Sequence, residues 1–424
     1  MNWTFTSLTL SSFSHSPFYM SSIMKHFHKF EIFNTNYHHS LSGFINSINS
    51  NNNKLKIYHS RFNYILNNVI TFNSQDIFGQ LYNSNSSLTT KEHNLNVKSS
   101  VFRHIWCNEG GAIMINDPYC ISLISNTGFA FCNSAANGAG IDYEGLILNI
   151  SRCCFFGCMA TQSGQGFYFY GKSAGKDIPY CNIEYTSIEQ CSPLQQRGAR
   201  ESIFLSHGLE TVQFINSTSN HIIEFGSCFV SAYTYGIGLH YSNFLDCTGE
   251  NCFWFHNTRR EDCLEKCNVI HNSAKKETGL FAFENGTTII SEFIFKNNHG
   301  SVYFVTGPVI LKNCVFDIQQ SSFTFYHCVH ECINVTWANK DFTSYPLPKL
   351  ITWQCWGFGK PSPTASKSLP PIEYVQEMTI SGISVFIVVM IIGFISGISV
   401  FSICNNTKEK IQMSGIQSVA ISNY

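Results

Sequence analysis

A short unit recurs along most of this chain, and a repeat of this kind constrains the fold more than any other feature. In each copy an apolar strand closes on Asn or Cys, and small polar residues then lead to Gly and another apolar strand. With a weaker copy at Phe214 included, the copies are 25 to 33 residues apart. The apolar residue three positions before the closing residue is Ile105, Ala130, Phe155, Ile188, Phe244, Val269 or Phe295. The closing residues are Asn108, Asn133, Cys158, Cys191, Cys247, Asn272 and Asn298.

The composition of the unit predicts short strands, because it is rich in Ile, Phe, Tyr, Thr and Val and is broken by Asn, Gly and Ser. Short strands that stack on copies of themselves form a parallel β-helix. We therefore expect an all-β solenoid that starts near residue 25, where Phe33, Asn36 and Gly43 form an earlier copy. Phe should stack inside the coils, and Asn at a bend should form a ladder with its amides bonded between coils. The other interpretation is a β-rich chain without regular topology.

The pairing of a Gly-Gly-Ala-Ile segment with Phe-x-x-Asn carries a family resemblance. Gly110, Gly111, Ala112 and Ile113 match the first half in full, and the segments that begin at Gly138 and Gly164 match it in part; Phe295 and Asn298 match the second half. This repeat resembles that of the chlamydial polymorphic outer-membrane proteins, and related surface proteins form large families in trichomonad parasites. The resemblance covers about residues 25–330. It implies a right-handed β-helix on a cell surface, in a family associated with adhesion.

The C-terminal part of the chain departs from that pattern. Residues 379–404 form a run of 26 residues without a charged side chain, and about 20 apolar residues span a bilayer core. We expect one transmembrane helix here. Lys408 and Lys410 follow it and favour a cytoplasmic tail with the body outside the plasma membrane. Gly393 and Gly397 form a GxxxG pattern that would allow weak homodimer contact between such helices.

Composition divides the chain into six expected parts. They are an N-terminal segment with a weak or absent signal peptide (1–24), the parallel β-helix (25–321), a C-terminal cap or Cys/Trp-containing module (322–358), a Pro/Ser-rich linker (359–378), the transmembrane helix (379–404) and a short tail (405–424). The poor signal leaves three explanations: targeting by the membrane helix, a start further upstream, or an atypical signal. Inserts at 170–180 and 257–265 should protrude from one corner, where we expect ligand binding.

The 18 Cys residues leave two interpretations open. Cys-rich chains usually belong to oxidising compartments and form disulfides. However, Cys158, Cys191 and Cys247 occupy the closing position of the repeat, where a free thiol would stack as a small apolar group. Glycosylation sequons are about as frequent as chance gives in an Asn-rich chain, so they add only weak support for export. They occur at Asn85, Asn149, Asn216, Asn285 and Asn334, with further copies at Asn2 and at Asn405 beyond the expected membrane segment.

Catalytic and metal motifs are weak in this sequence. Charged residues make up 12% of the chain and the net charge is −1, so we expect no nucleic-acid partner. Ser206, His207 and Gly208 only faintly match a catalytic His-Gly turn, without the Asp and Arg/Lys segments of a polysaccharide lyase. Two sets of residues have metal-ligand types, and we favour disulfides or packing for both. They are His327, Cys328, His330 and Cys332, and Cys263 and Cys267 with His256 and His271. We expect no catalytic, cofactor or metal site.

These observations favour a single-pass cell-surface protein whose β-helical ectodomain serves adhesion or ligand binding, to a host cell, a glycan, a protein or a neighbouring cell. The alternative is a membrane-tethered carbohydrate-active lyase or hydrolase. Acidic side chains from neighbouring coils that meet in one groove would favour that enzyme. A third possibility is a structural or antigenic coat protein without a specific ligand. The sequence does not name a ligand.

Overall fold

The structure is a computed structural model. It describes residues 2–20, 29–48, 54–73, 93–173, 175–192, 200–223, 226–257, 262–275, 279–300, 303–305, 307–320, 325–326, 330–338 and 342–348. The chain divides into two units, Met1–Phe358 and Gly359–Tyr424, and all described residues belong to the first. The expected linker, transmembrane segment and tail, with Gly393 and Gly397, therefore lie outside the described residues. Within the described part, no helix has both the length and the apolar character needed to cross a membrane.

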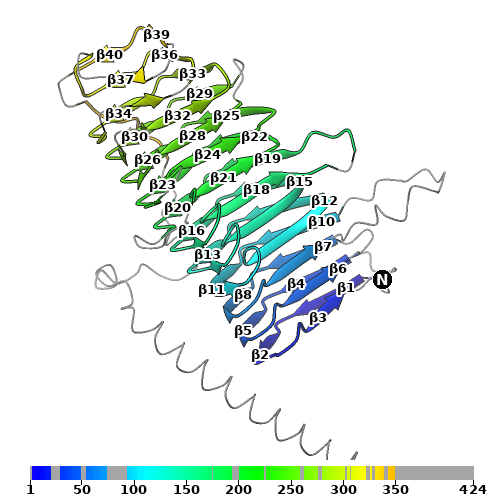
Figure 1. Cartoon of the computed structure of the whole chain (residues 1–424). Coiled ribbons are helices and arrows are strands. Elements are labelled where there is room, and N and C mark those ends of the chain that lie inside the picture. Colours follow the sequence, from blue (N-terminus) through cyan, green and yellow to red (C-terminus); the bar gives the residue numbers. More distant parts are fainter. Residues whose placement is uncertain are drawn as a thin grey trace, which may run out of the picture. The chain divides into compact units, whose positions relative to one another are not determined.

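The described body is a parallel β-solenoid, as the repeat predicted, and each coil contributes strands to three faces (Figure 1). Each strand of the first face pairs in parallel with its counterpart in the next coil. The strands of this face are β1 (Asn2–Thr6), β4 (Lys29–Phe33), β7 (Lys54–Tyr58), β10 (His93–Lys98), β19 (Tyr180–Glu184), β22 (Leu209–Gln213), β25 (Gly236–His240), β29 (Cys263–Glu265), β33 (Thr288–Ser291), β36 (Val309–Lys312) and β39 (His330–Ile333).

The second face is a separate ladder of mostly short strands. Its members are β2 (Thr9–Ser11), β5 (Asn36–Ser40), β8 (Arg61–Ile65), β11 (Val101–Cys107), β13 (Gly128–Ala130), β16 (Cys154–Phe156), β20 (Ser187–Glu189), β23 (Asn216–Thr218), β26 (Asn243–Leu245), β30 (Asn268–Ile270), β34 (Ile294–Lys296), β37 (Val315–Phe316) and β40 (Thr336–Trp337). Two-residue strands extend some coils beyond this face: β14 (Asn133–Ser134), β17 (Met159–Ala160), β27 (Thr248–Gly249) and β31 (Ser273–Ala274).

The third face returns the chain to the first face of the next coil. It consists of β3 (Phe18–Met20), β6 (Ile45–Ile48), β9 (Ile70–Asn73), β18 (Phe167–Gly171), β21 (Ile203–Ser206), β24 (Phe229–Ala232), β28 (Phe253–His256), β32 (Phe281–Glu284), β35 (Phe304–Val305) and β38 (Phe325–Tyr326). Two long strands, β12 (Ile113–Ser125) and β15 (Ile141–Ser151), run continuously from the third face into the first. They join the two faces into one 23-stranded sheet among the described strands.

The stack begins earlier and ends later than we predicted. β1 pairs with β4 from Asn2 onward, so the first coil lies within the expected N-terminal segment 1–24. At the other end, β39 and β40 pair in register with β36 and β37, so the expected module at 322–358 begins as a further coil. The terminal coils lack the Phe-x-x-Asn signature. Their backbone pairing does not depend on this signature, and it continues the stack.

Left-handed corners join the first face to the second and the second to the third. Asn126 and Arg152 at the first corner have φ of 47° and 51°, and Phe131 at the second has φ of 52°. The residue after the first corner is often Ser, Thr or Cys, because its side chain donates to the carbonyl two residues earlier. Ser60 Oγ donates to Tyr58 O at 3.0 Å, and Cys153 Sγ contacts Ser151 O at 3.4 Å. Thiols and hydroxyls therefore fill the same position of the coil.

The core is a stack of aromatic and aliphatic side chains, as the Phe content predicted. Phe62, Phe102, Phe129 and Phe155 stack along the axis with ring centroids 4.9 to 5.0 Å apart. The register corrects four of the expected repeat positions. Tyr37, Phe102, Phe129 and Ser217 hold this column, in place of Phe33, Ile105, Ala130 and Phe214. The other expected positions, from Phe155 onward, are confirmed. The spacing between copies changes near these residues, so sequence intervals alone misplaced them.

The Asn side chain at the closing position bonds both an amide and a carbonyl group of the previous coil, and we name this pair of hydrogen bonds the bracket. Asn272 Oδ1 accepts from the Cys247 amide at 2.9 Å, and its Nδ2 donates to Phe244 O at 2.9 Å. Asn298 repeats this pattern one coil on, with bonds to the Asn272 amide at 2.9 Å and Val269 O at 2.8 Å. This bracket satisfies buried backbone groups at a bend, and it explains the Phe-x-x-Asn half of the repeat.

The Gly pair of the repeat lies where coils approach closely. Gly110, Gly138 and Gly164 have φ of 63°, 53° and 67°, which glycine adopts without steric cost. A Cβ at Gly111 would lie 2.0 Å from Gly138 O in the next coil. The following residues, Ala112 and Ile113, are buried.

The cysteines divide unequally between the two expected roles. Cys154 is disulfide-bonded, whereas fourteen other cysteines among the described residues are free and twelve of these are buried. Cys158, Cys191 and Cys247 belong to the buried free set, so stacking thiols account for the closing positions. Burial raises the pKa of Cys120, Cys153 and Cys314 to about 12, which keeps these thiols protonated and unreactive.

Candidate binding surface

Connections between the third and first faces form the most variable corner of the described body. In β12 and β15 the chain crosses this corner without a break, and later coils open into turns. Residues 172–179 join β18 to β19, and residues 257–262 join β28 to β29. Both predicted inserts, 170–180 and 257–265, thus connect the same two faces, although residues 174 and 258–261 lie outside the described residues. Side chains at this corner are displayed by a regular backbone scaffold, which suits binding.

An aromatic stack follows this corner on the outside of the body. The rings of Tyr170 and His207 are 4.5 Å apart between centroids, those of His207 and Tyr233 5.3 Å, and those of Tyr233 and His256 4.3 Å. These residues come from successive coils. We had expected aromatic residues mainly in the core. The sequence pattern that would have revealed this outer stack is an aromatic or His residue at the end of successive third-face strands.

Further exposed apolar side chains lie in the turns that follow the stacked residues along the chain. The Leu209 amide donates to Pro179 O at 2.8 Å and the Tyr235 amide to Gly208 O at 2.9 Å, so the turns are bonded to each other. Ile178 is 59% exposed and Tyr233 is 52% exposed. We name this surface the corner patch, and it comprises Tyr170, Ile178, His207, Leu209, Tyr233 and Tyr235. Exposed apolar patches commonly mark interaction surfaces.

His207 has a packing role that the sequence motif did not predict. Its Nδ1 is 2.5 Å from Ser206 Oγ, and its ring lies between Tyr170 and Tyr233. Burial lowers the pKa of His207, so the imidazole is neutral at pH 7. A Cβ at Gly208 would lie 2.7 Å from the Phe169 ring, so glycine permits this tight turn. The Ser-His-Gly segment therefore helps to form an uncharged aromatic surface.

A group of charged residues borders the corner patch. Glu144 on β15 pairs with Lys172, whose Nζ also donates to Asn116 Oδ1 at 3.1 Å. Asp142, two residues before Glu144, is only 9% exposed, and burial, together with Glu144, raises its pKa to about 7. Its Oδ1 has no hydrogen-bond partner among the described residues. Residues of three coils meet here, although the acidic residues appear scattered in the sequence.

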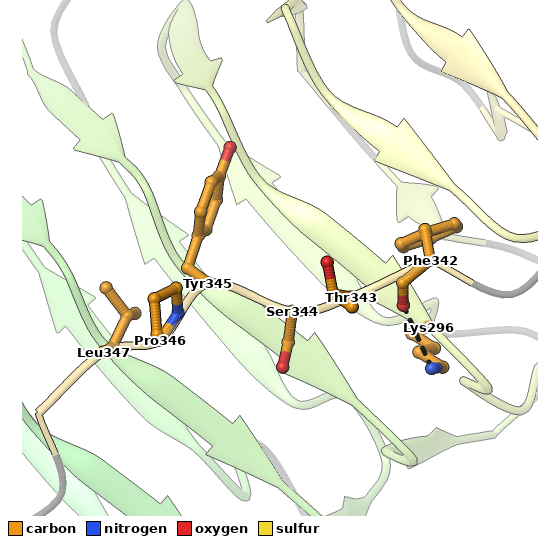
Figure 2. A pocket seen from close by; sticks show the side chains of 7 residues that line it. All are labelled: Lys296, Phe342, Thr343, Ser344, Tyr345, Pro346 and Leu347. Carbon is orange, nitrogen blue, oxygen red and sulfur yellow. Dashed lines mark hydrogen bonds between the residues drawn. The ribbon is translucent and has the colours of Figure 1, made fainter.

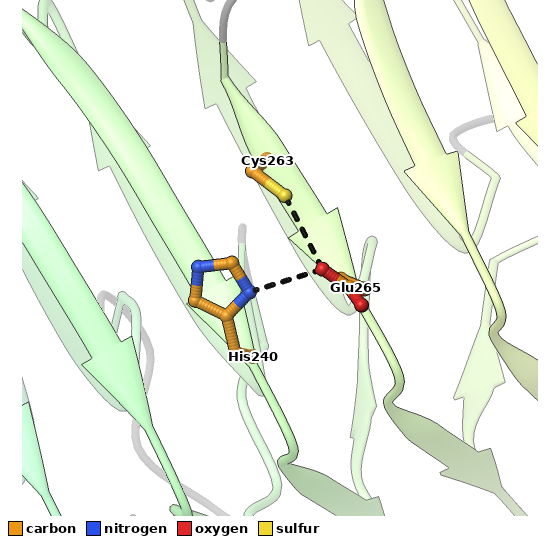
Figure 3. Close-up of side chains that lie close together, drawn as sticks. All are labelled: His240, Cys263 and Glu265. Carbon is orange, nitrogen blue, oxygen red and sulfur yellow. Dashed lines mark hydrogen bonds and ion pairs between the residues drawn. The ribbon is translucent and has the colours of Figure 1, made fainter.

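The structure separates the metal-ligand types that the sequence placed together. Cys267 is buried whereas Cys263 is exposed, and His256 and His271 pair instead with Glu284 at 2.8 Å and Asp246 at 3.4 Å. Cys332 is free and exposed, while His327 and Cys328 lie outside the described residues. A different set converges on the first face: Cys263 and Glu265 of β29 lie beside His240 of β25 (Figure 3).

The predicted glycosylation sites differ in access. Asn285 and Asn334 are exposed at left-handed corners with φ of 56° and 52°, and Asn149 is half-buried on β15. Asn216 is only 5% exposed, and its Oδ1 accepts from Asn243 Nδ2 at 2.8 Å. The folded body therefore does not present Asn216 for modification, contrary to our expectation. Asn2 lies in β1, and Asn85 and Asn405 fall outside the described residues.

The buried amide stack that contains Asn216 continues into a C-terminal segment. Asn268 Nδ2 donates to Asn243 Oδ1 at 2.7 Å, and Asn268 also exchanges two bonds of 3.0 Å with the Tyr345 backbone. Lys296 Nζ donates to Phe342 O at 3.1 Å (Figure 2). We name residues 342–348 the strap. An open hollow of about 530 Å³ lies between the strap and Lys296. The hollow is lined by Lys296 and by the strap itself, and Lys296 already bonds the strap, which makes this hollow a weaker binding candidate than the corner patch.

No protein-family model, no curated protein and no solved structure matches this chain.

Proposed function

We propose that the described body is the ectodomain of a single-pass cell-surface protein and that the corner patch binds a ligand in adhesion. The observation that carries the proposal is the corner patch, whose side chains are aromatic or aliphatic and carry no acidic or basic group other than the His207 imidazole, on a regular scaffold. Tyr presents an apolar ring together with a hydroxyl group. Such a surface favours a neutral ligand with both apolar C–H surface and hydroxyl groups, so we propose a glycan on a host cell or neighbouring cell. A protein ligand with similar chemistry is the second possibility within this function.

The topology proposed for the whole chain is a right-handed β-helix, a linker and one membrane helix. The hand follows the strong preference of parallel crossovers. The membrane helix rests on the 26 uncharged residues 379–404. With Lys408 and Lys410 inside, the body would be extracellular at the plasma membrane and the tail cytoplasmic. The repeat's resemblance to polymorphic outer-membrane proteins supports this surface role.

Binding of purified full-length chain to an array of immobilised neutral and sialylated glycans tests the adhesion proposal. We expect binding to neutral glycans, and a loss of about tenfold or more in the double variant Tyr233→Ala and Tyr235→Ala, because central aromatic contacts dominate such interfaces. Trp106→Ala is the matched control, since Trp106 is an exposed aromatic residue of the second-face ladder. Equal losses in both variants, or no glycan binding by the wild type, would overturn the proposal. The second result would favour the coat-protein function.

A carbohydrate-active enzyme remains the second candidate function, and Asp142 favours it. A carboxyl group with a pKa near 7 suits general acid or base work, and Glu144 and Lys172 lie close to it. Incubation with neutral and uronic-acid polysaccharides tests this candidate. Release of shorter chains by the wild type but not by Asp142→Asn would support the enzyme. An equal rate in both proteins would exclude a role for Asp142.

A further inference from the structure

The parallel register of β25 and β29 brings three metal-ligand side chains together. Gly238 pairs with Cys263, and His240 pairs with Glu265. Because side chains alternate along a strand, these four positions lie on the same side of the first-face strands, the side that points away from the core. Gly238 leaves room for the imidazole: a Cβ there would lie 2.8 Å from His240 Nε2. The register of β25 with β29 and the missing side chain at Gly238 together direct His240 toward Cys263 and Glu265.

Two of the three spacings between the ligand atoms are close to those of a tetrahedral metal site. His240 Nδ1 lies 3.9 Å from Glu265 Oε2, and Cys263 Sγ lies 3.7 Å from the same oxygen. All three atoms lie within 4.8 Å of one another (Figure 3). Zinc bond lengths at tetrahedral angles require an N···O edge of about 3.4 Å and an S···O edge of about 3.6 Å. Side-chain adjustments of a few tenths of an ångström would bring these two edges to tetrahedral length. The third edge, between Cys263 Sγ and His240 Nδ1, lies within 4.8 Å and would close to about 3.6 Å by rotation of the two side chains.

We propose that His240, Cys263 and Glu265 bind a Zn²⁺ ion on the outer face of the body. Imidazole, thiolate and carboxylate are the three ligand types that zinc prefers, and three protein ligands leave a fourth position for water or an external group. The side chains of His240 and Glu265 are partly exposed and Cys263 is exposed, so an ion can reach the site. This site is separate from the corner patch and does not depend on the proposed adhesion.

Neighbouring groups orient the ligands. Lys266 Nζ lies 3.2 Å from Glu265 Oε1, so this ion pair holds one carboxylate oxygen while Oε2 faces His240 and Cys263. Such contacts behind a ligand fix its orientation. Lys266 also lies 3.6 Å from Glu292 Oε2 and 5.7 Å from the centroid of the Tyr241 ring.

Binding changes only protonation and coordination. The Cys263 thiol releases its proton to solvent as the sulfur–zinc bond forms, His240 donates a lone pair from Nδ1, and Glu265 donates one from Oε2. No residue is oxidised or reduced. Water occupies the fourth position until an external ligand displaces it.

Titration of the full chain with Co²⁺ tests this site, because thiolate bound to Co²⁺ absorbs in the near ultraviolet. We expect one equivalent of Co²⁺ to produce this band and Zn²⁺ to abolish it. Cys263→Ser should remove the band, and His240→Gln and Glu265→Gln should each weaken Co²⁺ binding by about tenfold or more. Cys332→Ser and His271→Gln are matched controls, because Cys332 is the other exposed free thiol of the described body and His271 is an exposed His paired with Asp246.

A second measurement, made on the wild type, tests the proposal even if the variants do not fold. Zn²⁺ should protect Cys263, and not Cys332, from alkylation by a maleimide, as mapped by peptide mass spectrometry. No Co²⁺ band in the wild type, an unchanged band in Cys263→Ser, or equal alkylation of Cys263 with and without Zn²⁺ would overturn the proposal.

Discussion

At the scale of single residues, buried polar groups determine how coils join. Asn272 satisfies the Cys247 amide and the Phe244 carbonyl of the preceding coil, and Asn298 and Asn220 act in the same way at their own bends. A buried donor or acceptor left without a partner costs about 1–3 kcal/mol. Each closing Asn is therefore a local stabilising contact between neighbouring coils.

Asn272→Ala should lower the free energy of unfolding by about 2–5 kcal/mol, because it removes partners from two buried backbone groups. Chemical denaturation followed by circular dichroism measures the change. Asn182→Ala is the matched control, since Asn182 is a half-buried strand residue of β19, and we expect a change of about 0.5 kcal/mol or less. Equal effects of the two substitutions would show that the bracket does not stabilise the coil.

Asp142 should make stability fall as pH rises. Its pKa is raised from 3.8 to about 7 in the folded body, so between about pH 4 and 7 the folded state binds more protons than the unfolded state. Stability is greatest below this range and levels off above it. The total decrease in the free energy of unfolding through the range is at most about 4 kcal/mol. Asp142→Asn should therefore match the wild type near pH 4 and be more stable at pH 8.

Denaturation midpoints between pH 4 and pH 8 check the Asp142 prediction. Asp246→Asn serves as the control, because Asp246 is exposed and pairs only at the surface with His271. Parallel pH curves for the wild type and Asp142→Asn would contradict the assigned role of burial.

At the scale of elements, each coil combines three short strands with two left-handed corners. The residue after the first corner is Cys153 in one coil and Thr127 or Ser242 in others, and all contact the carbonyl two residues earlier. This equivalence explains why a chain rich in Cys keeps most described thiols free. Cys154, next to Cys153, is the exception, since it is disulfide-bonded.

Loss of the Cys154 disulfide should destabilise the body, whereas Cys153→Ser should not. Removing a native disulfide costs about 2–5 kcal/mol, so Cys154→Ser should lower the melting temperature. Cys153→Ser keeps a donor for Ile124 O and Ser151 O. Thermal melts with and without dithiothreitol provide the measurement. The reductant should lower the melting temperature of the wild type and of Cys153→Ser but not of Cys154→Ser. A wild type that is insensitive to reductant would contradict this account.

Much of the element structure could be predicted from the sequence, because strand composition and the closing residues recur. Phe155, Phe244 and Phe295 were placed correctly. Ile105 and Ala130 were not, since the coil length changes between them, and only backbone pairing fixes the register. The site was less predictable. His240 and Glu265 are 25 residues apart in the sequence and become neighbours only through the pairing of β25 with β29.

At the scale of the whole molecule, the solenoid provides a long surface with few charges. Contacts in such a fold are mainly between neighbouring coils, so loops at one corner can vary while the stack persists. The corner patch and the zinc-ligand residues lie on different parts of the coil. We propose that this body faces the outside of a cell.

Labelling of intact cells with a membrane-impermeant amine reagent distinguishes a body outside the cell from one inside it. Lys275, whose side chain is 59% exposed, lies on the described body, as do Lys172 and Lys176. We expect that peptides with these lysines are modified on intact cells, and that Lys408 and Lys410 react only after permeabilisation. Labelling of the body only in permeabilised cells would contradict the proposal, because the body would then lie inside the cell.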